Sequence, residues 1–221
     1  MKLAFPDIHN VVEVADGFVS SLVIENPALL WRFLQDLQQQ TQGREGQAVL
    51  SRDNTPVSLQ KSMELLMDFL NFDSNTKRLL PKLLRMLESR AQQEDYLQET
   101  HQMLAQMELF LDKLAYEADL ELAYEKLSLA SLLKAIGIHP VLEYNTLEER
   151  LFAYMELVYR LEGEKLFVLV NLRPFLPDKE TDTFLHTVVA HGIKALLVDG
   201  HSYPLLPLEK RLLIDRDLCE L

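Results

Sequence analysis

The sequence Leu166-Phe167-Val168-Leu169-Val170-Asn171 is the continuous apolar run that decides the fold. Because no polar residue alternates within this run, it cannot present a solvated face, and we expect a strand inside a sheet that is covered on both sides. A second run, Ala195-Leu196-Leu197-Val198-Asp199, follows some 24 residues after Asn171, and residues 181–191 between them are typical of a helix. The pattern predicts a β-α-β unit of two parallel strands whose carboxyl ends, at Asn171 and Asp199, lie on the same edge of the sheet.

The composition is that of a globular protein, because 221 residues with 48% apolar and 25% charged side chains can bury a core. The one cysteine, Cys219, excludes a disulfide within the chain, and the sequence does not open with an apolar segment and a cleavage site. No apolar stretch reaches the roughly 20 residues that a membrane span needs. We therefore expect a reduced, cytoplasmic protein with no membrane partner.

The net charge of −12 is distributed unevenly along the chain. Residues 94–125 carry nine acidic side chains and one lysine, whereas residues 77–90 carry five basic side chains and one acidic one. DNA binding is driven largely by local positive potential, so the overall charge does not exclude nucleic acid as a partner.

The order of the expected elements at the two ends of the chain predicts an α/β protein. Strand-like runs occupy residues 2–5, 10–14 and 18–24, and Asp16-Gly17 predicts a hairpin between the last two. A helix is expected from Pro27, with Asn26 as its N-cap, and a short strand follows at 48–51. A last helix at 147–161 leads into the central strand, and residues 212–214 can supply one more strand.

The middle of the chain predicts a helical insertion. From residue 59 to about 138 the apolar spacing is helical, with breaks at Asp73-Ser74-Asn75 and Gly137, so we expect helices at 76–90, 95–114 and 129–136. Apolar residues of the second helix form the narrow seam of an antiparallel helix pair: Leu97, Leu104, Met107, Leu111 and Leu114. We therefore predict a head domain formed by residues 1–58 and 140–221, with an inserted helical domain at residues 59–139.

The connection after the strand at 18–24 is where a phosphate-binding loop would lie, yet it reads Glu25-Asn26-Pro27. A phosphate needs glycines, which let backbone N–H groups approach it, and a lysine, whereas the acid here would repel it. On the same edge, Asn171 carries no charge, although Asp199 ends the neighbouring strand. The sequence predicts no nucleotide binding, and a divergent NTPase that uses Asp199 is the enzymatic alternative.

Five basic residues fall within four turns of the helix expected at 76–90, with leucines on the opposite side. They are Lys77, Arg78, Lys82, Arg85 and Arg90, and we call them the basic stripe. Pro81 should kink this helix, because proline removes a backbone donor and crowds the preceding turn. An ordinary solvated face and a DNA-binding surface both fit this pattern. Lys61, upstream of the stripe, is a sixth candidate DNA-binding residue.

Acidic side chains gather at Glu117-Ala118-Asp119-Leu120-Glu121 and Glu125, which we call the acidic run. If this segment is helical, Glu117, Glu121 and Glu125 stack at i, i+4 and i+8, and each like-charge pair costs roughly 0.2–0.5 kcal/mol. A solvated surface and a site for a hard divalent cation, calcium above all, both remain open, although no EF-hand loop is present. The histidines are scattered, so neither a zinc pattern nor a Ser-His-Asp grouping can be defined.

Six short stretches, taken in order, carry a family resemblance over essentially the whole chain. They are Phe5-Pro6, Leu22-Val23-Ile24-Glu25, Leu70-Asn71-Phe72-Asp73, Glu117-Ala118-Asp119-Leu120-Glu121, Leu132-Leu133-Lys134-Ala135-Ile136-Gly137, and Phe167-Val168-Leu169-Val170-Asn171 with Phe175-Leu176. The ordered set resembles the CRISPR-associated Csn-two family of subtype II-A.

The resemblance implies a non-enzymatic protein of spacer acquisition, with no catalytic residues, that forms a homotetrameric ring and takes linear double-stranded DNA through its hole. It also implies a degenerate P-loop/RecA-like head without a nucleotide site. The inserted α-helical leg would bind calcium (Ca2+) through acids, here Glu117, Asp119, Glu121 and Glu125. The ring would act in adaptive antiviral defence with the CRISPR integrase proteins and the RNA-guided effector nuclease.

The DNA-binding residues do not carry over from the family one by one, so the basic stripe is assigned to DNA by its charge alone. A third possibility, besides the ring and the NTPase, is an acidic helical scaffold that binds only proteins.

Overall fold

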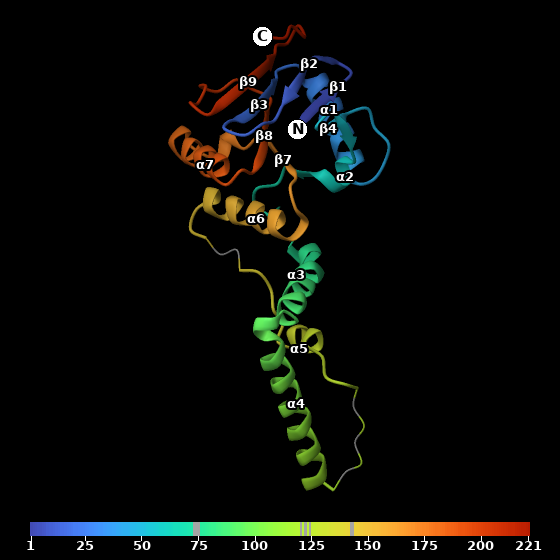
Figure 1. Cartoon of the computed structure of the whole chain (residues 1–221). Coiled ribbons are helices and arrows are strands. Elements are labelled where there is room, and N and C mark those ends of the chain that lie inside the picture. The colour runs from blue at the N-terminus through green and yellow to red at the C-terminus, as the bar shows by residue number, and fades with distance from the viewer. Residues whose placement is uncertain (73–75, 120, 122, 124, 142–143) are drawn as a thin grey trace. The chain divides into compact units, whose positions relative to one another are not determined.

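The computed structural model describes residues 1–72, 76–119, 121, 123, 125–141 and 144–221, and the chain divides into two compact units. One unit comprises Met1–Asp73 and Leu142–Leu221, and the other comprises Ser74–Val141. Figure 1 shows the helices and strands of both units. The sequence placed the start of the helical insertion at residue 59, but residues 59–73 belong to the first unit. The break expected at Asp73-Ser74-Asn75 lies outside the described residues.

A five-stranded parallel sheet is the centre of the first unit. Its strands are β3 (Val19–Ile24), β6 (Met63–Leu66), β7 (Leu166–Val170), β8 (Lys194–Asp199) and β9 (Glu209–Ile214), in the order β6-β7-β8-β3-β9. Every neighbouring pair is parallel. All residues of β7 and β8 are buried, and the helix α7 (Asp178–Ala190) lies between them in the chain. The predicted β-α-β unit and the α/β class are confirmed.

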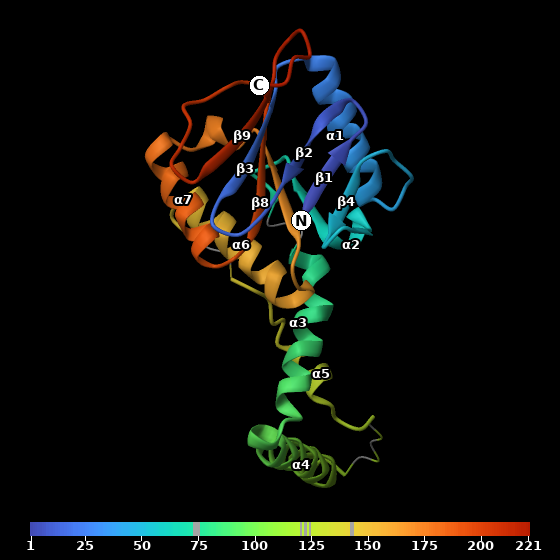
Figure 2. The ribbon, with the colours of Figure 1, turned by 45° about the horizontal axis from the view of Figure 1, so that its top comes forward.

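Helices cover both faces of this sheet, as Figure 2 shows. The helix α1 (Pro27–Thr41) buries Leu29, Phe33 and Leu37 in one core with the even-numbered residues of β7. Because side chains alternate along a strand, Phe167 and Leu169 point to the other face, where α6 (Leu147–Glu162) and α7 lie. Burial on both faces explains why the central run is apolar throughout.

The second sheet of this unit is antiparallel. Its strand pairing shows that the hairpin predicted between residues 10–14 and 18–24 is wrong. It contains β1 (Lys2–Phe5), β2 (Ile8–Glu13), β4 (Val49–Arg52) and β5 (Thr55–Val57), in the order β2-β1-β4-β5. β2 pairs with β1, whereas β3 pairs with β8 and β9, so the chain crosses between the two sheets at Asp16-Gly17. Gly17 has a φ of +84°, which suits a turn, but a turn does not decide which strands pair. All six residues of β3 are buried, and only the inside of the parallel sheet accommodates such a strand.

Residues 63–66 form a strand where the sequence predicts a helix. The helix α2 (Leu59–Ser62) has four residues, and β6 then pairs in parallel with β7 at the edge of the sheet. Met63 and Leu66 are buried in this strand. A short apolar run fits a helix or a strand by spacing alone, and pairing with β7 decides between them here.

The second unit contains α3 (Thr76–Ala91), α4 (Glu94–Glu117) and α5 (Leu129–Ala135), each within three residues of its predicted ends. α3 continues through Pro81. No residue of α4 is buried, and most of its predicted apolar seam is exposed: Leu97, Met107, Leu111 and Leu114. Among the helices that the structure describes, none is both long enough and apolar enough to cross a membrane.

Candidate functional site

The five side chains of the basic stripe are all exposed on α3. Arg78, Lys82 and Arg85 are spaced i, i+4 and i+7, so they share one face over about 10 Å of helix. The opposite side of α3 carries leucines, of which Leu79 and Leu84 are buried. The apolar side is thus used for packing, and the basic side presents three cations in a row, spaced so that neighbouring phosphates of a nucleic acid could bind them.

Of the other three basic candidates, Lys77 and Arg90 lie off that face of α3, and Lys61 belongs to the other unit. Lys77 points about 100° away from Arg78 around the helix axis. Arg90 lies at the end of α3, with its guanidinium carbon 6.0 Å from the centre of the Tyr96 ring. Lys61 is in α2, which belongs to the other unit. The structure therefore brings three of the six candidates onto one face.

The acidic run is not a continuous helix. α4 ends at Glu117, whose carboxylate lies 3.8 Å from the ammonium of Lys113 one turn earlier. Asp119 follows in the left-handed region with a φ of +50°, a conformation that aspartate tolerates better than most residues. Glu121 and Glu125 lie outside any helix, and Leu120 is outside the described residues. Because this segment is not helical beyond Glu117, Glu117, Glu121 and Glu125 do not stack one turn apart on one helix face.

Among the residues that the structure describes, the acidic run does not gather into a cation site on one chain. Calcium takes about six to eight oxygen ligands that converge on one point. In the part of the chain that the structure describes, no group of three or more His, Cys, Asp or Glu side chains could hold a metal ion. The four candidate ligands Glu117, Asp119, Glu121 and Glu125 therefore do not fit a preformed calcium site.

In the connection between β3 and α1, the backbone N–H groups at the start of the helix bond to a side chain of the chain itself. In a phosphate-binding loop these N–H groups would be free to bind the ligand. Oδ1 of Asn26 accepts hydrogen bonds from the backbone N–H groups of Ala28, at 3.1 Å, and Leu29, at 3.0 Å. The next position, Pro27, has no N–H group. Nδ2 of Asn26 donates to the carbonyl of Arg216 at 3.0 Å, which ties the cap to the segment that follows β9. The N-terminus of α1 is thus already capped by a side chain of the chain itself.

Asp199 ends β8 as a buried carboxyl group. Only 2% of the residue is exposed, and its Oδ1 has no hydrogen-bond partner among the residues described. Burial raises the pKa of Asp199 to about 6, while the positive charges of Arg173 and Arg211 act in the opposite direction. At the end of the neighbouring strand, Oδ1 of Asn171 accepts the N–H of Gly200 at 3.3 Å. Asp199 is thus enclosed by the protein, and Asn171 has a structural role.

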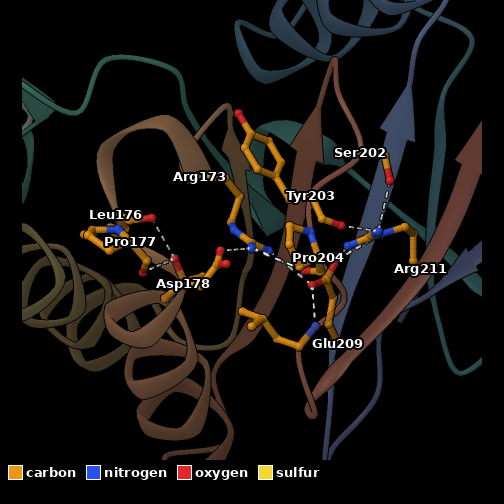
Figure 3. Close-up of polar contacts among 11 residues, drawn as sticks. Arg173, Leu176, Pro177, Asp178, Ser202, Tyr203, Pro204, Glu209 and Arg211 are labelled. Atoms are coloured by element: carbon orange, nitrogen blue, oxygen red, sulfur yellow. Dashed lines mark hydrogen bonds and ion pairs between the residues drawn. The ribbon is translucent and has the colours of Figure 1, made fainter.

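Figure 3 shows an ionic network built on two buried residues, Arg173 and Glu209, with the more exposed Asp178 and Arg211 as further partners. Arg173, in the 3-10 turn η2 (Arg173–Phe175), pairs with Glu209 at 3.3 Å and with Asp178 at 2.6 Å. Arg211 pairs with the other carboxylate oxygen of Glu209 at 2.7 Å. We call these four residues the Arg173 network. This network was not predicted from the sequence, although Arg173, three residues after the buried β7, and the charged start of β9 were visible signals.

Comparisons with known proteins agree with the fold described above. The family described as CRISPR-associated protein (Cas_Csn2) matches residues 40–218. The crystal structure of Stu0660 of Streptococcus thermophilus is similar with a TM-score of 0.55 at 17% identity, over 90% of this chain and 68% of that chain, which supports the fold alone. A putative ABC transporter (ATP-binding protein) from Pyrococcus furiosus has a TM-score of 0.36 at 10% identity, over 96% of this chain and 97% of that one, too low to support any conclusion. No curated protein matches the sequence.

The family match spans most of the chain and includes the basic stripe, the acidic run and four strands of the parallel sheet. It agrees with the resemblance carried by the six ordered stretches. The chain therefore belongs to the CRISPR-associated Cas_Csn2 family.

Proposed function

We propose that this chain is a non-enzymatic DNA-binding protein of CRISPR spacer acquisition that encloses the ends of linear double-stranded DNA as a homotetrameric ring. Membership of the Cas_Csn2 family supports the CRISPR-associated part. The observation that carries the DNA-binding part is the exposed row of Arg78, Lys82 and Arg85 on α3, in a chain whose net charge is −12. A concentrated positive face on an acidic protein is where a polyanion can bind without regard to base sequence.

The exposed apolar side chains of α4 support assembly. This helix has 24 residues and buries none of them within the chain. Its exposed apolar residues include Phe110, Leu111 and Leu114. Exposed apolar surface of this extent marks a protein interface, and a second copy of the chain offers the same surface in a closed symmetric assembly. We propose that α4 packs against other copies in the ring.

The head unit is proposed to be a degenerate P-loop/RecA-like domain that binds no nucleotide. The supporting observation is the Asn26 cap, which occupies the N–H groups of Ala28 and Leu29 that a phosphate would need. The enzymatic alternative, a divergent NTPase, would depend on Asp199, whose carboxyl group is buried beside the Arg173 network.

Calcium dependence, a cytoplasmic location and action with the integrase proteins and the effector nuclease also belong to the proposal, through the family resemblance. Because the described carboxylates of one chain do not form a calcium site, no step of DNA binding is assigned to the ion here. Phosphate contacts from α3 would hold DNA through charge alone.

A salt series of DNA binding tests the proposal. The double variant Lys82→Ala/Arg85→Ala should bind linear duplex more weakly, about equally for all sequences, and the slope of log affinity against log salt should flatten by roughly one unit per lost contact. The matched control, Lys179→Ala/Arg216→Ala, also removes two exposed cations but from the other unit, and it should change less. Parental affinity and slope in the first variant would move the DNA path away from α3. No binding by the parent would favour the protein-only scaffold.

A further inference from the structure

The outer edge of β2 carries backbone groups without a neighbouring strand, because β2 is the last strand of the antiparallel sheet. Val14, directly after β2, exchanges backbone hydrogen bonds of 2.7 and 2.8 Å with Met1. Since the direction of the backbone groups alternates along a strand, Val12 also points its N–H and C=O groups inward, to β1. The odd-numbered residues Val11 and Glu13 therefore point theirs outward.

Both ends of this outer edge are bonded to other parts of the chain. The hydroxyl of Ser20 donates to the carbonyl of Glu13, as expected for a carbonyl that points outward. At the other end, the carboxylate of Glu220 accepts the backbone N–H groups of His9, at 2.5 Å, and Asn10, at 2.8 Å. The chain thus covers the two ends of the edge and leaves its middle.

Val11 is the residue in that middle. Its backbone has no outward partner among the residues that the structure describes, and 47% of the residue is exposed. The opposite edge of the same sheet is β5, which carries Pro56, a residue that cannot donate to an added strand. β2 has no such protection at Val11, and a β-branched side chain favours strand pairing.

A groove of about 180 Å³ lies beside this edge. It is lined by residues 10–13 of β2, by Phe18, Ser20 and Ser21, and by residues 210–212 of β9. The ammonium of Lys210 lies 3.7 Å from the centre of the Phe18 ring, and Glu220 bridges to Ile214 four residues further along β9. A groove of this size suits one or two side chains of an extended segment and excludes a folded domain.

Lys210 gives the groove an uncompensated positive charge. It is exposed, and it forms no ion pair with a residue that the structure describes. The neighbouring charges are paired, Arg211 with Glu209 at 2.7 Å and Glu13 with Lys2 at 3.5 Å. A ligand that complements this groove therefore carries a negative charge.

We propose that the outer edge of β2 binds an extended, acidic segment of a partner protein as an added strand. The segment bonds to the backbone of Val11, and one of its carboxylates reaches Lys210 across the groove. Glu220 shows that a carboxylate fits this edge, and it ends the added strand there. The contact is thus a few residues long, which gives a weak and reversible complex. It does not depend on DNA binding, which is assigned to the other unit.

Fluorescence anisotropy with labelled peptides tests this docking site. The probe is a capped seven-residue peptide with glutamate at every second position and threonine or valine between. One matched peptide has lysine in place of glutamate, and the other has an N-methyl group on every backbone nitrogen. The glutamate peptide should bind saturably. The lysine peptide should bind more weakly, by up to about fivefold for the loss of one exposed ion pair, and the N-methylated peptide should not bind.

Two variants assign the binding to β2 and to the groove. Val11→Pro removes an outward N–H group, and proline is tolerated on edge strands, so the variant should fold and bind the glutamate peptide about tenfold more weakly. Its mass in light scattering and its affinity for DNA should stay parental. Lys210→Glu should reverse the preference between the glutamate and lysine peptides. Lys179→Glu, the same charge change at an exposed position of α7, should leave the preference unchanged.

The docking site would be overturned by the absence of saturable binding of the glutamate peptide to the unmodified protein, a measurement that needs no variant. Equal binding of the N-methylated peptide, or parental binding by Val11→Pro, would also overturn it, because the backbone of β2 would then not be the partner. A lower mass of Val11→Pro without peptide would mean that a second copy of the chain covers this edge instead.

Discussion

Nη1 of Arg173 lies 3.3 Å from Oε2 of Glu209, and the side chain of each residue is 1% exposed. The pair joins η2, which follows β7, to the first residue of β9 on the far side of β3. Because both charges are out of water, each is stabilised mainly by the other and by the hydrogen bonds around them. The ion pair therefore fixes two connections of the parallel sheet.

Removing Glu209 should destabilise the first unit strongly. We predict that Glu209→Ala lowers the free energy of unfolding by about 3–5 kcal/mol, because it leaves two guanidinium groups without their shared carboxylate. Urea denaturation measures the loss. The control Glu156→Ala removes a more exposed pair with Arg160 and should cost less than about 1 kcal/mol. Similar losses in the two variants would show that burial of the Arg173 network contributes little.

The Asn26 cap gives a second prediction about stability. Asn26→Ala should lower the free energy of unfolding by about 0.5–2 kcal/mol, because the N–H groups of Ala28 and Leu29 lose their acceptor. Asn26→Gly should cost only a few tenths of a kcal/mol relative to the parent, because glycine itself is tolerated at this position. Thermal or urea unfolding of both variants checks the order. An alanine variant as stable as the parent would mean that Asn26 does not cap α1 in solution.

Nucleotide binding should be absent. Calorimetry with Mg-ATP is expected to give no saturable heat, because the connection at Glu25-Asn26-Pro27 presents an acid and a capped helix end to a triphosphate. The matched titration with ADP should give the same result. A saturable heat of micromolar affinity would restore the NTPase alternative and direct attention to Asp199.

Divalent-cation removal tests the calcium part of the proposal. If calcium joins copies of the chain, chelation should shift the tetramer to smaller species and weaken DNA binding, since a ligand that binds only the assembled form stabilises it by mass action. Light scattering in chelator, and again after calcium is restored, measures the change. The variant Glu121→Gln/Glu125→Gln should weaken the response to calcium. A tetramer that is unchanged in chelator and still binds DNA would remove the ion from the mechanism.

The sequence predicted the elements that local periodicity controls. The strands β7 and β8 were identifiable because they are buried on both faces, and α3, α4 and α5 because their apolar residues repeat at helical spacing. The five residues of the basic stripe and Lys61 upstream of it were visible in the sequence, but their grouping was not. Lys61 belongs to the other unit than α3, and this division depends on tertiary contacts that local spacing does not show.

Pairings between distant segments could not be predicted from the sequence. The turn at Asp16-Gly17 was recognised, yet burial of β3 in the parallel sheet overrode the hairpin. β6 became a strand because β7 offered a partner about a hundred residues away. The Arg173 network joins residues 36 positions apart, so no local spacing reveals it. α4 ends at Glu117, and Asp119 after it adopts a left-handed backbone. Aspartate tolerates this conformation but does not need it, so the sequence did not predict where the helix ends.

The central claim is that a ring threads onto DNA ends and holds phosphates by charge. Its most direct test compares binding of the unmodified protein to one linear duplex and to a covalently closed circle of the same sequence and length, at the same salt concentration. We predict binding of the linear form, with affinity that falls steeply as salt is raised, and little binding of the circle, because a closed ring must be entered from an end. Equal affinity for the linear and the closed DNA would contradict the threaded ring.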